Sequence, residues 1–305
     1  MSQPQYSLTY SLGLDKYYEV PLETENFIGR EDDLQKLEDA LSPRKNEPHH
    51  SVGIYGPGGI GKTQLALRYA YDNQDEYRTV KFFNARSEKD LKASIEKFFD
   101  YLISRKDERL LSTAGKDCKD KCAAVLKWFE DERKWLLVYD DADFDPAYDP
   151  SVYFPKHAYG HIILIGRGSK VKAYTESSME LHPLKRPDAI DMLLKRSTTS
   201  IQPPTANSKE IAQVAGEIVD ELAGSPGFIE AAAKYILHAK PTLKEYLLML
   251  RNQKQNKRLH SAKGLLGDAF ASWELTLNKL KSEPKSMLLL KLFVFLDGAN
   301  ISTIL

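Results

Sequence analysis

Hydrophobic and polar positions follow two different patterns along the chain, and the pattern changes near residue 183. Before this point, short apolar runs stand between longer segments whose apolar residues recur every three or four positions, which is the spacing of one helix face. The runs are unbroken rather than alternating, as is typical of strands buried on both faces of a helix-covered parallel sheet. We predict such strands at residues 52–55, 80–83, 135–139 and 162–165.

After Pro183 the strand pattern stops, and helical periodicity continues at residues 189–194, 211–222, 228–237 and 243–250. The first 25 residues are polar and rich in tyrosine, with no sustained periodicity. The chain itself ends on an apolar run, so we expect its last domain to be truncated. The predicted organisation is a tail or linker over 1–25, an α/β domain over 26–182, a helical subdomain over 183–262, and the start of a further subdomain over 263–305.

Composition narrows the class of protein. Of the 305 residues, 42% are hydrophobic and 28% are charged, which allows packed cores. Lys plus Arg number 43 and Asp plus Glu also number 43, so the zero net charge argues against a dedicated nucleic-acid binder. The longest apolar run, residues 287–296, contains Lys291, whereas a membrane span needs about 20 apolar residues. Two cysteines form no disulfide framework, and no secretory signal is visible, so we expect a cytoplasmic protein without a membrane span.

Residues 56–63 read GPGGIGKT and carry the strongest chemical signal in the chain. The pattern G-x-x-x-x-G-K-[ST], between a predicted strand and a predicted helix, is typical of a phosphate-binding loop, or P-loop. Its glycines let backbone N–H groups face an anion, Lys62 would contact the β- and γ-phosphates, and the Thr63 hydroxyl would ligate Mg²⁺. The alternative is a glycine-rich turn that caps a helix. The candidate nucleotide contacts in this segment are Gly58, Gly59, Ile60, Gly61, Lys62, Thr63 and Gln64.

A P-loop protein also needs a carboxylate at the end of a neighbouring strand, where it holds Mg²⁺. The segment WLLVYDD at residues 135–141 supplies two. Asp140 is the candidate for the metal, together with Thr63, and Asp141 is the candidate for orienting or deprotonating an attacking water. An apolar run that ends in two aspartates is also common at ordinary strand ends, so this assignment depends on the P-loop.

The next predicted strand, HIILIGRG at residues 161–168, ends with Arg167. If this strand lies beside the strand before the P-loop and the strand that ends in Asp140, the Arg167 guanidinium would reach the γ-phosphate. It would then distinguish a triphosphate from a diphosphate. The alternative is an ordinary exposed arginine after a strand. Lys62, Asp140, Asp141 and Arg167 are therefore the candidate catalytic residues.

In this order the motifs resemble the NB-ARC (NACHT-like) nucleotide-binding module of STAND ATPases. This module is the switch of plant resistance proteins, apoptotic protease activators and many fungal NOD-like receptors. The resemblance extends from NFIGRED at 26–32 through the P-loop, the Asp-Asp strand and the arginine strand. It continues with LHPLKRPDAIDMLLKRS at 181–197 and GSPGFIEAAAKYI at 224–236, which resemble the start of the first helical subdomain and its G-x-P motif. Residues 263–305 look like the start of a winged-helix subdomain.

The resemblance implies further contacts with the nucleotide. In the family the NFIGRED-like motif lies near the adenine, which implies Phe27, Ile28 and Arg30, and the G-x-P proline packs on the base, which implies Pro226. The chain departs from the family at three points. Pro226 lacks the usual flanking leucines, Arg167 lacks a preceding Thr or Ser, and an M-H-D-like histidine is expected only beyond residue 305.

The resemblance also implies a function. ADP would hold a closed state and ATP would favour an open, self-associating state, with Mg²⁺ bound and with slow hydrolysis. The switch would act in immune or programmed cell-death signalling, and repeats beyond residue 305 would sense an unknown ligand. Adenine nucleotide and further copies of the chain are thus the expected partners, and nucleic acid is not.

The sequence is also compatible with two other classes of protein. An AAA+ initiator-type ATPase acting on DNA shares the GR motif, the P-loop and a winged helix, and the local basic segment KRLHSAK at 257–263 is compatible with it. A P-loop kinase of small molecules would need an arginine-rich lid and an acceptor pocket, and the sequence locates neither.

Overall fold

The computed structural model describes residues 17–20, 27–42, 50–113, 115–142, 148–156, 159–197 and 208–258. The chain divides into two compact units, Gln5–His182 and Pro183–Leu305 with Met1–Pro4. Each unit is described by itself below. The predicted winged-helix segment, residues 263–305, lies outside the described residues.

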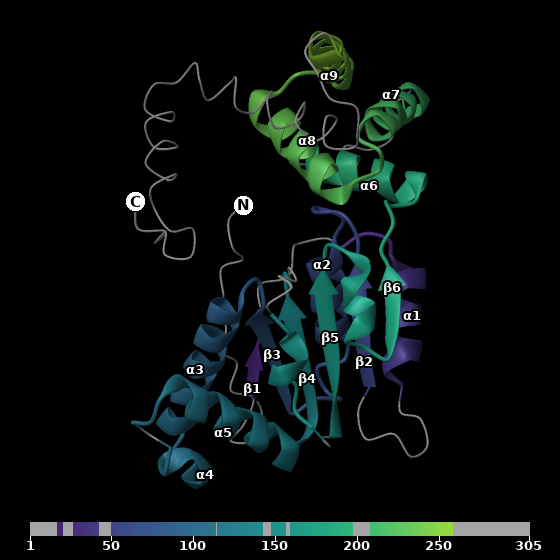
Figure 1. The fold of residues 1–305 in the computed structure, drawn as a ribbon. Coiled ribbons are helices and arrows are strands. Elements are labelled where there is room, and N and C mark those ends of the chain that lie inside the picture. The colour runs from purple at the N-terminus through teal and green to yellow at the C-terminus, as the bar shows by residue number, and fades with distance from the viewer. Residues whose placement is uncertain are drawn as a thin grey trace. The chain divides into compact units, whose positions relative to one another are not determined.

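The first unit contains a parallel sheet of six strands, in the order β1-β3-β4-β5-β2-β6 (Figure 1). The predicted α/β fold with a parallel sheet is therefore confirmed, and each of the four predicted strands is longer than its apolar run. The strands are β1 (Tyr17–Glu19), β2 (His50–Tyr55), β3 (Thr79–Asn84), β4 (Arg133–Asp140), β5 (Tyr159–Gly166) and β6 (Ser177–Glu180).

Helices cover both faces of this sheet (Figure 1). The core on one face includes residues of α3 and α5, and the core on the other includes residues of α1 and α2. In β4, Trp135 and Leu137 belong to the first core, whereas Leu136 and Val138 belong to the second. Because successive side chains of a strand point to opposite faces, burial on both faces explains the unbroken apolar runs. The helices are α1 (Glu31–Leu41), α2 (Lys62–Asp72), α3 (Glu88–Ser104), α4 (Glu108–Leu111) and α5 (Cys118–Asp131), with 3₁₀ turns at Pro150–Tyr153 and Ser169–Ala173.

The prediction of a tail or linker over residues 1–25 is wrong for Tyr17–Glu19. These residues form the edge strand β1, which pairs in parallel with β3 through Tyr17 and Thr79. The Tyr17 ring is buried and lies 4.8 Å from the Phe98 ring, centroid to centroid. Three residues are too few to show a periodicity, so the pairing partner and not the local pattern determines this strand.

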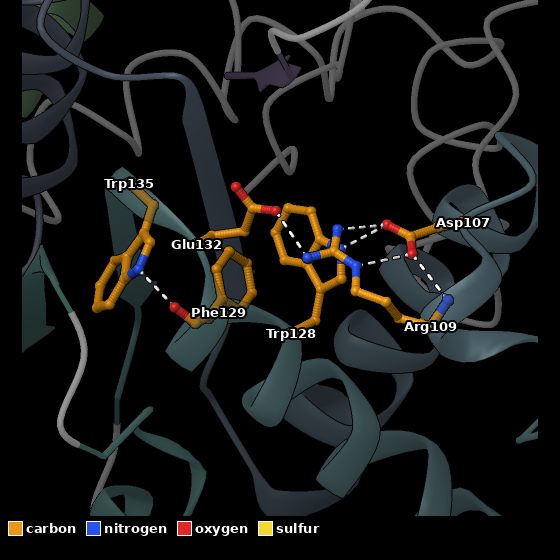
Figure 2. Close-up of polar contacts among 6 residues, drawn as sticks. All are labelled: Asp107, Arg109, Trp128, Phe129, Glu132 and Trp135. Atoms are coloured by element: carbon orange, nitrogen blue, oxygen red, sulfur yellow. Dashed lines mark hydrogen bonds and ion pairs between the residues drawn. The ribbon is translucent and has the colours of Figure 1, made fainter.

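Around α4 and α5, polar contacts tie the two helices together (Figure 2). We call Asp107, Arg109, Trp128 and Glu132 the α4–α5 corner. The Arg109 guanidinium donates to Asp107 at 2.6 Å and to Glu132 at 2.9 Å, and it lies 5.2 Å above the Trp128 ring. The Trp128 indole N–H also donates to Asp107, at 2.7 Å. Each of the four side chains in the corner thus has a partner within it.

Every secondary-structure element described in the second unit is a helix, as predicted for the segment after Pro183. Its helices are α6 (Arg186–Ser197), α7 (Ser208–Glu221), α8 (Pro226–Ala239) and α9 (Leu243–Arg258). The turn before α8 packs closely on the chain before α6, because Leu184 N–H donates to the Gly224 carbonyl at 3.0 Å. In the described part of the protein, no helix combines the length and the apolarity that a membrane span requires.

Candidate functional site

The predicted P-loop connects the end of β2 to the start of α2. Gly59 and Gly61 have φ angles of 75° and 99°, a left-handed backbone that other residues adopt only with strain. Gly61 immediately precedes α2, whose first hydrogen bond runs from Leu65 N–H to the Gly61 carbonyl. The N–H groups at the start of a helix have no acceptor within the helix. The loop thus has the left-handed glycine backbone and the helix N-terminus that suit a phosphate group.

Lys62 lies across the start of the same loop. Its ammonium donates to the carbonyls of Gly56 at 2.8 Å and Pro57 at 2.9 Å, and the residue is 9% exposed. The positive charge is therefore held against the main chain of the P-loop, where it can also meet an anion. The sequence analysis did not include Gly56 and Pro57 among the site residues, because their contribution is a backbone carbonyl and not a side chain.

Thr63 and Asp140 lie together although they are 77 positions apart. The Thr63 hydroxyl lies 3.0 Å from both carboxylate oxygens of Asp140. Asp140 is the last residue of β4 and also accepts from the Asp141 N–H at 2.8 Å. A hydroxyl and a carboxylate are the oxygen ligands that Mg²⁺ prefers, so this pair suits the metal.

Burial raises the pKa of the Asp140 carboxyl to about 6, and smaller effects of Thr63, the Asp141 N–H and Lys62 act in the opposite direction. A carboxylate that is costly to charge gains more from a cation than an exposed one does. The raised pKa of Asp140 is therefore typical of a carboxylate whose charged form a bound divalent cation would stabilise.

Asp141 and Arg167 meet at the same edge of the sheet. The strand β5 pairs with β4 on one side and β2 on the other, which is the position that the sequence analysis required for the arginine. The Arg167 guanidinium lies 3.9 Å from the Asp141 carboxylate, with both side chains exposed. Asp141 has a φ angle of 58°, in the left-handed region, so the backbone turns sharply directly after Asp140.

The remaining predicted contacts lie at different distances from this centre. Phe27 is half-buried against the core that contains α1 and α2, and the Arg68 guanidinium lies 5.9 Å from its ring. Ile28 and Gln64 are also half-buried, and Ile60 is buried. The Arg30 side chain bonds to the carbonyl of Ile60 in the P-loop at 2.9 Å.

Pro226 is the first residue of α8 in the helical unit, which is described separately from the P-loop. Proline suits the first helical position, because its missing N–H would have no partner there. Its contact with an adenine base stays a prediction.

The segment that follows β6 was expected to open the helical subdomain, and its place beside the P-loop was not predicted. Leu181 N–H donates to the Tyr55 carbonyl at 2.8 Å, so this segment lies beside the start of the P-loop. A Cβ atom on Gly56, where φ is 148°, would lie 2.8 Å from the Leu181 carbonyl oxygen. The signal available in the sequence was the first glycine of the motif, which sits directly after a strand.

Comparison with known proteins links part of the chain to ATPase domains. The family model described as "AAA ATPase domain" matches residues 26–151. A nucleotide-binding leucine-rich repeat (NLR)-like protein of Hyaloscypha variabilis is 26% identical over 249 residues, which cover 76% of this chain and 24% of the relative. The chain thus spans about a quarter of the length of that relative.

Two solved structures are similar. Cdc6p from Pyrobaculum aerophilum has a TM-score of 0.50 and 16% identity, with 72% of this chain and 63% of that chain covered. A STAND protein with a tetratricopeptide repeat sensor from Pyrococcus horikoshii has a TM-score of 0.47 and 20% identity, with 74% and 33% covered. The likeness to Cdc6p supports the fold alone. Residues 26–151, which contain the P-loop and the Thr63–Asp140 pair, are thus similar to AAA ATPase domains.

Proposed function

We propose that the chain is the adenine-nucleotide-binding core of an NB-ARC-like signalling switch of the STAND class, with slow Mg²⁺-dependent ATP hydrolysis. The observation that carries the proposal is the Thr63 hydroxyl at 3.0 Å from the Asp140 carboxylate, at the end of a glycine-rich loop. The NFIGRED, arginine-strand and G-x-P motifs support the NB-ARC-like part. So does the NLR-like relative, whose name includes nucleotide binding.

In this proposal Lys62 and the loop N–H groups hold the phosphates, while Thr63 and Asp140 hold Mg²⁺, which neutralises charge on the phosphates. Asp141 orients the attacking water. Arg167 contacts the γ-phosphate, and to do so its guanidinium leaves Asp141, now 3.9 Å away. The γ-phosphate of a triphosphate and the Asp141 carboxylate would therefore compete for the Arg167 guanidinium.

The contact between Arg167 and the γ-phosphate is too weak to operate the switch alone. Moving a two-state switch from 1:99 to 99:1 takes about 5.5 kcal/mol of differential binding. One hydrogen bond to a charged group contributes about 1.5–3 kcal/mol. The remainder would come from an upstream ligand or from self-association. We expect hydrolysis on the order of 10⁻⁴–10⁻² per second, by analogy with GTPase switches.

The biological part of the proposal is signalling in immunity or programmed cell death, within the cytoplasm. It is drawn from the family resemblance and from the NLR-like relative. The alternative is an AAA+ initiator-type ATPase acting on DNA, because the matching family model is an AAA ATPase domain. The balanced net charge favours the switch, since a protein that loads onto DNA would carry a basic surface.

The deciding experiment is to purify the chain, denature it and identify the released nucleotide. We expect ADP at about one per chain, and Lys62→Ala protein prepared in the same way should release none. Release of guanine nucleotide, or a failure to bind added ADP and ATP with Mg²⁺, would contradict the proposal.

Two further measurements separate the alternatives. Salt-sensitive binding to duplex DNA in a gel shift would favour the initiator-type ATPase. Phosphoryl transfer to an added small molecule, or a turnover above about 10 per second, would favour a metabolic kinase or ATPase.

A further inference from the structure

Arg30 has an almost enclosed side chain, only 7% exposed, although it lies in the turn that precedes α1. One guanidinium nitrogen, Nη1, donates to the Asp33 carboxylate at 3.0 Å and to the His182 carbonyl at 2.7 Å. The other, Nη2, donates to the Ile60 carbonyl at 2.9 Å. Two of these acceptors are main-chain carbonyls that lie 30 and 152 positions away. The side chain thus joins three separate segments of the first unit.

The backbone at Arg30 is also unusual. Its φ angle is 75°, in the left-handed region, which costs a non-glycine residue free energy. Gly29 before it has a φ angle of 67°, so two successive residues turn the chain into α1. A strained residue of this kind persists where the surrounding contacts hold it. The contacts that hold Arg30 include those of its guanidinium and the bond from Leu34 N–H to its carbonyl at 2.8 Å.

The segment at residues 181–182 is bonded to the residue before the P-loop directly and to the middle of the loop through Arg30. Leu181 N–H bonds to Tyr55 immediately before the loop, and the His182 carbonyl is linked through Arg30 to Ile60 within it. The Leu181 and Ile60 side chains belong to the same hydrophobic core. His182 is the last residue of the first unit, and Pro183 begins the helical unit. The P-loop is therefore bonded to the chain segment that leads into the helical unit.

We propose that Arg30 is a positioning residue that ties the P-loop to the linker at residues 181–182. Phosphate binding in the loop would then be transmitted to the chain that leads into the helical unit. This inference rests on the proposed function, because it needs a nucleotide in the P-loop. The planar guanidinium fork bridges two carbonyls in fixed directions, which a lysine ammonium on a flexible stem does not reproduce.

The inference assigns the Arg30 side chain a different role from contact with adenine. Its bonds run to the main chain of the loop and the linker, so it acts on how firmly the loop is held and not on which base is bound. Loss of the side chain should therefore weaken ADP and GDP binding by the same factor. A direct contact with the base would change the ratio of the two affinities.

The test is hydrogen exchange measured by mass spectrometry on the full chain, with and without MgADP. Two peptides are followed, one over residues 53–64 and one over residues 178–184. Arg30→Gly removes the side chain and tolerates the left-handed backbone, so the substitution adds no backbone strain. Arg30→Lys retains the charge without the fork. Arg109→Ala is the matched control, because it removes an arginine with several partners from the α4–α5 corner (Figure 2).

In the wild type and in Arg109→Ala, we expect MgADP to slow exchange in both peptides. In Arg30→Gly, MgADP should slow exchange in the P-loop peptide only, and a fluorescent ADP analogue should dissociate about tenfold faster. Arg30→Lys should resemble Arg30→Gly in the linker peptide. The ratio of ADP to GDP affinity should stay unchanged in both variants.

Two outcomes would overturn the inference while leaving the nucleotide switch intact. One is linker protection by MgADP in Arg30→Gly that equals the wild type, and the other is a changed ratio of ADP to GDP affinity. A wild-type P-loop peptide that MgADP does not protect would instead contradict the proposed function itself. The two failures are thus distinguishable in one experiment.

Discussion

Two aspartates in the first unit carry pKa shifts in opposite directions. At the α4–α5 corner, hydrogen bonds from Arg109 hold the pKa of Asp107 at about 2, and the Trp128 N–H adds to this effect. At the P-loop edge, burial raises the pKa of Asp140 to about 6. The protein thus stabilises the charged form of Asp107 through hydrogen bonds. For Asp140, burial outweighs the hydrogen bonds and disfavours the charged form. The difference separates a structural carboxylate from one suited to an added cation.

The two regions also differ in what their arginines bind. Arg109 bonds to carboxylates and lies over an aromatic ring, so its interactions stabilise the corner and depend on charge. Two of the acceptors of Arg30 are main-chain carbonyls, so its bonds determine where backbone segments lie. Substitutions at the corner should accordingly change stability, and substitutions at the P-loop edge should change binding.

The largest effect is expected from Lys62→Ala. Removal of the ammonium deletes charge-assisted hydrogen bonds to phosphate of about 1.5–3 kcal/mol each, so ADP affinity should fall about 100-fold or more. Isothermal titration calorimetry measures the loss. Lys119→Ala, which removes an exposed lysine of α5, is the control and should bind as the wild type does. Equal ADP affinities for the wild type and both variants would contradict a role of Lys62 in nucleotide binding.

Lys62→Arg provides a finer version of the same test. The enclosed ammonium lies within 2.9 Å of two loop carbonyls, which leaves little room for a planar guanidinium. We expect this variant to lose nucleotide binding as well, although its charge is unchanged.

Gly160→Ala should give the next largest effect, and on stability. A Cβ atom at this position would lie 2.1 Å from the Trp135 ring, whose indole N–H donates to the Phe129 carbonyl at 2.9 Å (Figure 2). Overpacking of this kind costs about 1–3 kcal/mol. Urea denaturation measures the loss, and Gly58→Ala, where a Cβ meets no atom within 4 Å, is the control. A variant as stable as the wild type would show that the Trp135 environment adapts.

Mg²⁺ affinity of the nucleotide-bound protein should depend on pH through Asp140. With a pKa of about 6, the carboxylate fraction falls from about 0.9 at pH 7 to about 0.1 at pH 5, so affinity should fall about tenfold. Mg²⁺ titrations at pH 5, 6 and 7 measure this. Asp140→Asn shows how much of the change comes from the nucleotide's own phosphates. A wild-type profile identical to that of the variant would exclude Asp140 as the titrating ligand.

The same shift has a consequence for the protein without nucleotide. Because the folded-state pKa of Asp140 is above the unfolded value, its contribution to stability is present below about pH 4 and is lost as pH rises through 6. Asp140→Asn should therefore be more stable than the wild type at pH 7 in the absence of Mg²⁺ and nucleotide. Thermal denaturation at pH 4 and pH 7 measures the difference.

The smallest effect is expected from Trp128→Phe at the α4–α5 corner. The variant loses the hydrogen bond to Asp107, so stability at pH 7 should fall by about 0.5–1.5 kcal/mol. The pKa of Asp107 is lowered in the fold, so its contribution is present above about pH 4 and lost as pH falls toward 2. Urea denaturation between pH 2 and pH 7 should show a smaller loss on acidification in the variant. An unchanged pH profile would contradict this role of Trp128.

The central strands and the P-loop were predictable because their signals are local. A strand that is buried on both faces is mostly apolar, so β2, β3, β4 and β5 are visible as runs, although β3 also buries Lys81. The edge strands were not predictable in the same way. The three residues of β1 are too few for a pattern, and the side chains of β6, with the sequence SSME, are half-buried or exposed.

The sequence by itself determined the α/β class, the helical segment after Pro183 and the P-loop motif, because each depends on contiguous residues. Only the tertiary structure decided that Arg30 joins Ile60 to His182, that Thr63 lies against Asp140, and that burial raises the pKa of Asp140. These properties arise between segments far apart in the chain. They depend on which strands are neighbours in the sheet and on how much water the packing excludes, and no local pattern of residues encodes either quantity.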